Sequence, residues 1–369
     1  MSLKAIHGAV FLILAIVINS ATCDSSAQIP DTVSALNSWF QANVKPVESR
    51  KGTLDPLLVA AEAKPKIIKV RKNGSGDFKT VTDAVKSIPL KNTQRVIVDI
   101  GGGVYTEKVE IDVDQPFVTF YGSPKDMPTI SFGGTAKKFG TDDSATLIVM
   151  GDYFVAANII FQNTAPKPEG AVGGQGVALR IWGNKAALYN CKLLGFQDTL
   201  CDDHGIHFYK DCYIEGTVDF IFGRGKSMFV NSELHVIKDK FLTVITAQAR
   251  SMPEEDTGFV FAHCTITGEG DGANDRNGAY LGRAWQKMPR VIFAYTKMGS
   301  AVSVEGWYDN IHPERQKTVE FAEYKSSGPG FTPEKRVKYS KQYTAAQAEP
   351  YLTLDYVEAS KWLLPPPQL

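Results

Sequence analysis

The chain of 369 residues holds 40 lysines and arginines against 40 aspartates and glutamates, so its formal net charge is zero. This balance excludes a protein that binds nucleic acid through overall positive charge, and any attraction to an acidic polymer must be local. Hydrophobic residues make up 43% of the chain, as in ordinary globular proteins, and the length allows one or two domains.

The first 23 residues have the pattern of a secretory signal peptide. Lys4 precedes an unbroken run of ten apolar residues from Ala9 to Ile18, and small residues follow. A segment that spans a bilayer needs about 20 apolar residues, and no later segment comes close. We therefore expect a signal peptide over residues 1–23 and a secreted mature protein that does not bind membranes.

Two short amphipathic helices are expected in the N-terminal part of the chain. An N-terminal segment, residues 24–65, contains apolar residues at helical spacing after Asp31, which predicts a helix over residues 31–44. The same kind of pattern predicts a second helix over residues 80–88. The glycine-rich turn between them contains Asn73, in the sequence Asn-Gly-Ser, which is a candidate for N-glycosylation.

From about residue 95 the chain consists of short apolar runs separated by Gly, Asn and Asp, a pattern that predicts strands and turns. Aligning six similar tripeptides gives steps of 33, 21, 20, 32 and 32 residues between their central residues, which are Asn158, Cys191, Cys212, Ser232, Cys264 and Thr296. A repeat of about 20 residues with insertions predicts stacked coils of parallel strands, that is, a right-handed parallel β-helix over residues 66–369. An antiparallel β-sandwich, which also has short strands, is the alternative. Long polar stretches, such as residues 136–144, are expected to be loops on one face.

Two aspartates fall at equivalent positions of adjacent coils. Asp198 and Asp219 are 21 residues apart, the same step that separates two successive repeat positions. Stacked parallel strands lie about 4.8 Å apart, so the two carboxyl groups are expected to be close neighbours. Gln197 directly precedes Asp198, and Gln175 lies 22 residues earlier, about one coil back.

Such a group of carboxyls and amides suits hydrolysis. Two neighbouring carboxyl groups do not both ionise easily, so one keeps its proton while the other stays charged, which places an acid beside a nucleophile. The amides of Gln175 and Gln197 offer N–H donors to an oxyanion. Retaining glycosidases also use two carboxyl groups about 5 to 5.5 Å apart, so spacing alone leaves an esterase and a glycosidase open.

Five motifs, in order, resemble those of the plant pectin methylesterases. They are Gly103-Val104-Tyr105-Thr106-Glu107, Gly174-Gln175-Gly176-Val177-Ala178-Leu179, Gln197-Asp198-Thr199-Leu200, Asp219-Phe220-Ile221-Phe222-Gly223 and Leu281-Gly282-Arg283-Ala284-Trp285. The resemblance covers the chain from about residue 66, and with Cys201 and the C-terminal tail it is similar to pollen-expressed members, some of which are known as allergens. It implies hydrolysis of the methyl esters of galacturonic acid units in cell-wall pectin, which releases methanol and leaves pectate.

The resemblance also implies how the reaction proceeds. Asp219 would attack the ester carbonyl and form an acyl-enzyme, while Asp198 would protonate the departing methanol and then activate water. Gln175 and Gln197 would hold the oxyanion.

Further roles follow from the same matching positions. Arg283 would donate hydrogen bonds to Asp219 and orient it. Three aromatic residues are candidates for contact with the substrate: Trp285, Trp307 and Phe220. The resemblance implies no metal and no organic cofactor.

The expected partners are methyl-esterified homogalacturonan and a separate proteinaceous inhibitor. Many plant members carry an inhibitor-like pro-region, and the roughly 40 residues between the signal peptide and the first motif are too few for one. We expect a monomer that acts in the cell wall. Cys191 and Cys212 stack on neighbouring coils at a distance that a disulfide could bridge, and a disulfide and two free thiols both remain open.

Overall fold

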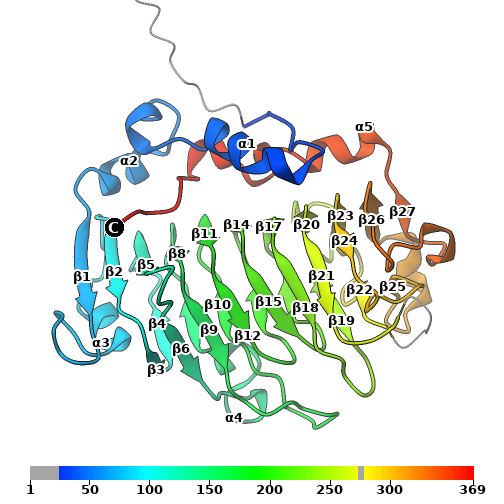
Figure 1. Ribbon diagram of the computed structural model, residues 1–369, viewed down its shortest axis with the longest axis horizontal. Helices are drawn as coiled ribbons and strands as arrows, with labels where there is room; N and C mark the ends of the chain where they lie inside the picture. The colour runs from blue at the N-terminus through cyan, green and yellow to red at the C-terminus, as the bar shows by residue number, and fades with distance from the viewer. Residues whose placement is uncertain (1–24, 273–277) are drawn as a thin grey trace, which may run out of the picture.

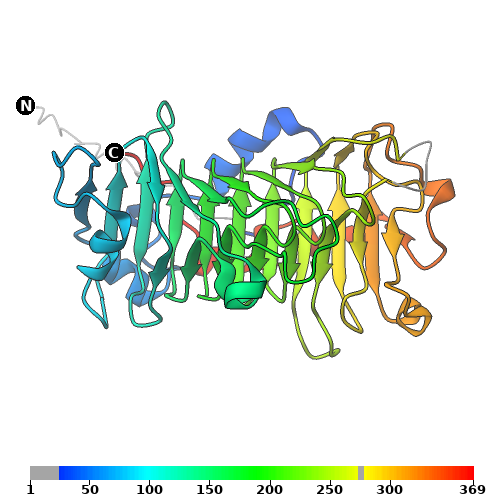
Figure 2. The same cartoon turned by 90° about the horizontal axis from the view of Figure 1, so that it is seen from below.

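The computed structural model describes residues 25–272 and 278–369 as a coil of three sheets whose strands pair in parallel (Figure 1). A view turned by 90° shows the coils stacked side by side along the long axis (Figure 2). The predicted right-handed parallel β-helix is confirmed, and the alternative of an antiparallel sandwich is wrong. The predicted signal peptide, residues 1–23, lies outside the described residues.

The largest sheet, called the long sheet here, has 11 strands and runs the whole length of the coil. Its strands are β1 (Lys66–Val70), β2 (Val96–Ile100), β5 (Val118–Gly122), β8 (Val155–Ala157), β11 (Ala186–Tyr189), β14 (Ile206–Lys210), β17 (Lys226–Val230), β20 (Gly258–Ala262), β23 (Arg290–Ala294), β26 (Glu320–Tyr324) and β27 (Lys341–Gln342).

The other two sheets have eight strands each. The second sheet contains β4 (Val109–Ile111), β7 (Leu147–Val149), β10 (Leu179–Ile181), β13 (Leu200–Asp202), β16 (Ile221–Gly223), β19 (Val244–Gln248), β22 (Tyr280–Arg283) and β25 (Trp307–Tyr308). The third sheet contains β3 (Val104–Thr106), β6 (Thr129–Phe132), β9 (Ile160–Asn163), β12 (Lys192–Leu194), β15 (Tyr213–Gly216), β18 (Glu233–Val236), β21 (Thr265–Gly268) and β24 (Lys297–Met298).

Helices are few and short. Both predicted helices are present, as α1 (Leu36–Asn43) and α3 (Val81–Lys86). Two further helices are not predicted from the sequence: α2 (Pro56–Glu62), which begins with a proline at its first turn, and α5 (Ala345–Ala348). Residues 136–144, predicted to be a loop, contain the short helix α4 (Ala136–Phe139). No helix within the described ranges is long and apolar enough to cross a membrane.

The structure corrects the first step of the repeat. Residue Lys192 of β12 pairs with Ile160 of β9, a step of 32 residues rather than 33, so Asn158 corresponds to Asn190 and not to Cys191. The side chains of these two asparagines are bonded at 2.8 Å. This turn position has a left-handed backbone in seven successive coils, at Asn158, Asn190, Asp211, Asn231, His263, Tyr295 and Lys325. Apart from glycine, Asn and Asp tolerate that conformation best, which explains why they occupy the first four of these seven positions.

The coil is filled by stacked aromatic rings. Phe229, Phe261 and Phe293, one on each of three successive long-sheet strands, stack with ring centroids 4.5 Å apart. The side chains that alternate with these phenylalanines along each strand point outward, yet all five residues of β20 are buried. The outer face of the long sheet must therefore be covered as well as the inner face.

That cover comes from both ends of the chain. Helices α1 and α2 lie beside the C-terminal segment that carries α5, along one side of the coil (Figure 1). The guanidinium of Arg50 is buried and donates to the backbone oxygens of Ala359, Ser360 and Leu363. The backbone N–H of Asp55 donates to the oxygen of Lys361 at 2.8 Å. The two segments therefore form one layer held by buried hydrogen bonds.

The hydrogen bonds of Arg50 are expected to contribute strongly to stability. Arg50→Met removes a donor from three carbonyl groups, and the free energy of unfolding should fall by about 2 to 4 kcal/mol. Lys51→Met, at the exposed neighbouring position, is the matched control and should change it by less than about 0.5 kcal/mol. Urea unfolding of the two variants measures the difference, and equal stabilities would contradict this role.

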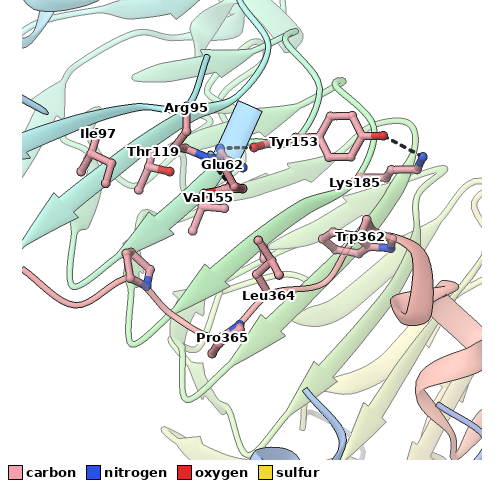
Figure 3. Close-up of a pocket in the computed structure, with 12 residues that line it drawn as sticks. Glu62, Arg95, Ile97, Thr119, Tyr153, Val155, Lys185, Trp362, Leu364 and Pro365 are labelled. Atoms are coloured by element: carbon pink, nitrogen blue, oxygen red, sulfur yellow. Dashed lines mark hydrogen bonds and ion pairs between the residues drawn. The ribbon is translucent and has the colours of Figure 1, made fainter. Parts of the chain in front are cut away.

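A small pocket of about 110 Å³ lies between the long sheet and the C-terminal tail (Figure 3). Its charged groups are already paired, because Arg95 bonds Glu62 at 2.7 Å and Lys185 forms an ion pair with Asp55. The pocket belongs to the terminal cover and is lined by long-sheet strands, not by the strands that follow Asp198 and Asp219.

Candidate active site

Asp198 and Asp219 occupy equivalent turns that precede two neighbouring strands of the second sheet, β13 and β16. Each lies two residues before a strand, and Leu200 of β13 pairs directly with Ile221 of β16. The two aspartates are therefore neighbours on adjacent coils, as the sequence analysis expected. The backbone N–H of Asp198 donates to the oxygen of Val218 at 3.0 Å, which joins the two turns directly.

Both turns have an unusual backbone conformation at the aspartate. Asp198 has φ of 66° and Asp219 has φ of 51°, in the left-handed region that few residues other than Gly, Asn and Asp adopt. The hydroxyl of Thr199 donates to the oxygen of Glu215 at 2.8 Å and fixes the first turn. Held in this way, both carboxyl groups are nine-tenths buried, with 8% and 5% of their residue surface exposed.

Arg283, at the end of β22, holds Asp219. Its Nε donates to Oδ1 of Asp219 at 2.8 Å, and its Nη2 donates to Oδ2. Its third nitrogen, Nη1, donates to Oδ1 of Asn310 at 3.0 Å. This two-point contact fixes the carboxylate plane and favours the charged form of Asp219. The predicted contact between Arg283 and Asp219 is present.

The two carboxyl groups differ electrostatically. Burial raises the pKa of Asp198 well above its ordinary value, and the negative charge of Asp219 raises it further. Burial also raises the pKa of Asp219, but the charge and hydrogen bonds of Arg283 oppose that rise. Asp198 therefore keeps its proton to higher pH than Asp219, so the pair holds one acid and one carboxylate over a common pH range.

The two glutamines lie beside the pair but not in one column. Leu179 of β10 pairs with Leu200, which makes Gly176 the register partner of Gln197 and leaves Gln175 one residue out of line. The Gly176 N–H donates to the Gln197 oxygen at 3.1 Å, so the two segments touch. Oε1 of Gln175 is buried without a hydrogen-bond partner among the described residues.

Two of the three aromatic candidates are in the core, so their predicted role in substrate contact is wrong. Trp307 is 1% exposed and stacks on Phe321 at 4.5 Å, because its position on β25 points into the coil. Phe220 precedes β16, and its fully buried ring belongs to the core inside the coil. Trp285 is 47% exposed, with its ring 4.8 Å from the guanidinium carbon of Arg283.

An open cavity of about 320 Å³, close to the lower size of ligand pockets, is lined by residues that follow the pair along the chain and by Trp285, whose ring contacts Arg283. Its lining includes Cys201 and Phe222, on the outward side of β13 and β16, and Trp285. Asp142 and Asp203 line it as well, and so does Arg224, which the sequence analysis missed. Because side chains alternate between the two faces of a strand, the sequence indicates that Phe222, which follows inward-facing Ile221, points outward. Within the described ranges no group of three or more His, Cys, Asp and Glu is placed to hold a metal ion.

Three of the four described cysteines lie away from this cavity. Cys191, Cys212 and Cys264 are buried free thiols, so the candidate disulfide between Cys191 and Cys212 is not formed in the structure. Burial raises the pKa of Cys191 to about 12. Its sulfur lies 3.5 Å from the oxygen of Tyr189.

Asp202, between the cavity-lining residues Cys201 and Asp203, belongs to a buried polar network. It accepts hydrogen bonds from Tyr209 at 2.6 Å and Ser227 at 2.7 Å, and its Oδ2 lies 3.2 Å from Nδ1 of His207. Nε2 of His207 lies 3.0 Å from the oxygen of Gly183. Burial, the largest single effect, lowers the pKa of His207, but the charge and hydrogen bond of Asp202 and the hydrogen bond to Gly183 together outweigh it, so the pKa is raised.

This network predicts a pH-dependent contribution to stability. A histidine with a raised pKa binds its proton more tightly in the folded state, so its stabilisation is complete below the unfolded pKa of about 6.5 and is lost as pH rises through the folded value. The free-energy difference between the wild type and His207→Gln should therefore be largest in acid and shrink with rising pH. Urea unfolding across pH measures it, and a difference independent of pH would contradict a charged His207.

Known proteins match this chain over most of its length. The sequence profile of the family described as Pectinesterase matches residues 67–360. The chain is 51% identical to "Pectinesterase 2" of Olea europaea over 97% of this chain and 96% of that protein. It is 49% identical to "Probable pectinesterase 50" of Arabidopsis thaliana over 92% of each.

Solved structures give the same picture. The pectin methylesterase from carrot superposes with a TM-score of 0.72 at 29% identity, over 80% of this chain and 94% of that one. A pectin methylesterase in complex with a hexasaccharide superposes with a TM-score of 0.69 at 26% identity, over 81% of this chain and 98% of that one.

Proposed function

Because the chain belongs to the pectinesterase family, we propose that Asp219 and Asp198 are the groups that carry out the family's reaction here. The protein is a carboxylic ester hydrolase that removes methyl groups from the galacturonic acid units of pectin and releases methanol. The observation that supports the assignment of residues is the coupled pair itself: two buried carboxyl groups on adjacent coils, only one of which is held by an arginine.

The first half of the reaction forms an acyl-enzyme. A carboxylate oxygen of Asp219 attacks the ester carbonyl carbon, and the carbonyl oxygen becomes an oxyanion that the side-chain amides of Gln175 and Gln197 stabilise. The carbon–methoxy bond then breaks, and the methoxy oxygen takes the proton of Asp198 to leave as methanol. Asp219 and the galacturonic acid unit are left joined as an anhydride, and Asp198 is left as a carboxylate.

The second half regenerates both groups. Asp198, now ionised, accepts a proton from a water molecule, which attacks the galacturonyl carbon. The anhydride bond breaks, and Asp219 departs as a carboxylate that Arg283 is already placed to stabilise. Asp198 ends protonated, as it began. One residue acts as acid and base in turn, which requires the raised pKa that burial and Asp219 produce.

A glycosidase with the same carboxyl pair is the rival that spacing alone leaves open. Family membership favours the esterase, and products discriminate the two directly. Methanol should be released from highly methylated pectin in the presence of a chelator, without new reducing ends and without unsaturated sugars. New reducing ends or unsaturated products instead of methanol would contradict the assignment.

Secretion, domain limits and binding partners are part of the proposal. Residues 1–23 support secretion to the cell wall, and residues 66–369 form the proposed pectinesterase domain with residues 24–65 as a preceding segment. A separate inhibitor protein and a monomeric state are also proposed. Asn73 stands in a turn, where its Oδ1 accepts hydrogen bonds from Ser75, and is proposed to be glycosylated. Intact mass and size-exclusion chromatography of the secreted protein test these proposals, and an unmodified Asn73 or a dimer would contradict them.

A further inference from the structure

The guanidinium of Arg283 has three nitrogens, and only two of them serve Asp219. The remaining nitrogen, Nη1, donates to Oδ1 of Asn310 at 3.0 Å. The guanidinium carbon also lies over the ring of Trp285, 4.8 Å from its centroid, where the positive charge is favoured. Arg283 is therefore fixed by Asp219, Asn310 and Trp285 together.

The loop that follows β25 runs beside the segment that carries Arg283. Arg283 at the end of β22 pairs with Tyr308 at the end of β25. Further along the loop, Nη1 of Arg315 donates to the backbone oxygens of Ala284 at 2.6 Å and Trp285 at 2.9 Å. The loop therefore holds this segment through backbone bonds as well as through the side chain of Arg283.

The backbone of the loop suits an asparagine at position 310. Asn310 and Ile311 have φ of 60° and 59°, in the left-handed region that Asn adopts more readily than most residues. Asp309 fixes the turn, because its Oδ1 accepts from the N–H of Ile311 at 3.0 Å and its Oδ2 accepts from Nε2 of Gln316 at 2.7 Å. The carboxylate of Asp309 is thus engaged within the loop, while the amide of Asn310 faces Arg283.

The acceptor on Nη1 of Arg283 is neutral, and its neutrality matters for Asp219. Burial raises the pKa of Asp219, and the charge and hydrogen bonds of Arg283 oppose that rise. On the other side of the pair, the negative charges that act on Asp198 are those of Asp219 and Asp142. A carboxylate in place of the amide would share the charge of Arg283 with Asp219. The amide oxygen accepts the hydrogen bond of Nη1 without that competition.

We propose that Asn310 is a positioning residue for the reaction, because it holds Arg283 against Asp219 through a neutral acceptor. The inference rests on the proposed function of Asp219 and goes beyond it, since Asn310 acts on the nucleophile only through Arg283. A carboxylate attacks efficiently when its oxygens are held on the line of attack, and a fixed guanidinium holds them there. Asn310 therefore contributes to the chemical step more than to the binding of substrate.

The first test removes the acceptor. Asn310→Gly keeps the left-handed turn, since Gly adopts positive φ without steric cost. The kcat for methanol release from a methyl-esterified oligogalacturonide should fall by about three- to tenfold, while KM stays within about twofold of the wild type. Circular dichroism checks that the variant is folded. An unchanged kcat, or a loss confined to KM, would overturn the role of Asn310.

The second test adds a charge at the same place. Asn310→Asp keeps the shape of the side chain and tolerates the same turn, but its carboxylate competes with Asp219 for Arg283. The charged form of Asp219 is then less stabilised and its pKa rises. The acid limb of the pH profile of kcat/KM should therefore move to higher pH by about 0.5 to 1 unit.

The matched control for the added charge is Ile311→Asp. Ile311 is the next residue, has nearly the same φ and is 81% exposed, so solvent and salt screen a carboxylate there. The acid limb of this variant should coincide with that of the wild type. An unmoved acid limb in Asn310→Asp, or equal shifts in the two variants, contradicts the inference.

These outcomes are distinct from a failure of the proposed function. If Asn310→Asp and Asn310→Gly behave as the wild type while Asp219→Asn is inactive, the role of Asn310 fails and the chemistry at Asp219 stands. Near-native release of methanol by Asp219→Asn overturns the proposed function itself. If Asn310→Gly does not fold, the comparison of Asn310→Asp with Ile311→Asp maintains the test.

Discussion

Asp219→Asn should lower the rate of methanol release by at least about 10³-fold, because an amide oxygen does not replace a carboxylate nucleophile. The shape of the side chain is kept, so substrate should still bind. Initial rates on highly methylated pectin, with methanol as the measured product, give the size of the loss.

The control for this variant must separate chemistry from folding. Asp219→Asn leaves Arg283 without its charged partner, and such a loss at a buried site can destabilise a protein by about 3 to 5 kcal/mol. Rates should therefore be taken well below the unfolding temperature and divided by the folded fraction. Asp211→Asn is the matched variant, because Asp211 is exposed and has the same left-handed backbone, with φ of 58°. Near-native turnover by Asp219→Asn would exclude it as the nucleophile.

Asp198→Asn should lower kcat by about 10² to 10⁴-fold while it raises stability at neutral pH. Activity falls because the amide can neither protonate methanol nor activate water. Stability rises because burial and the charge of Asp219 disfavour the ionised form of Asp198, a cost that the neutral amide does not carry. Catalysis and stability are therefore expected to change in opposite directions at this one position.

The sign of the pH dependence follows from the raised pKa. The folded state favours the protonated form of Asp198. Below the unfolded pKa of about 3.9 this group is protonated in both states, so it does not lower the free energy of unfolding of the wild type. As pH rises through the folded pKa the wild type loses stability, and each unit of the shift corresponds to about 1.4 kcal/mol. The advantage of Asp198→Asn in urea unfolding should thus grow with pH and then level off. An advantage that is constant over pH, or a less stable variant at neutral pH, would contradict a protonated Asp198.

The stacking of the coils could be predicted because a solenoid repeats its sequence pattern together with its backbone structure. The 21-residue step between Asp198 and Asp219 is the register of β13 on β16, so counting residues was enough to place the pair on adjacent coils. Similarity of the tripeptides predicts a step from Asn158 that is one residue too long, because the register follows the left-handed turn residue instead.

Other features depend on contacts between distant segments, which periodicity does not contain. Trp307 is an aromatic residue that the sequence offers as a contact for sugars, but its inward position on β25 places it against Phe321. Arg50 appears in the sequence as an ordinary surface arginine, and only the folded C-terminal segment supplies its three carbonyl partners.

The most direct test of the central claim is to trap the acyl-enzyme with hydroxylamine during turnover of a methyl-esterified oligogalacturonide. An anhydride on Asp219 should yield hydroxamate, either on the galacturonic acid unit or on Asp219, only when substrate is present. Mass spectrometry of the sugar and of the peptide that contains Asp219 detects both products, and neither should form with Asp219→Asn. Hydroxamate on Asp198, equal hydroxamate with the Asp219→Asn protein, or none at all while methanol is released at the full rate would contradict Asp219 as the nucleophile.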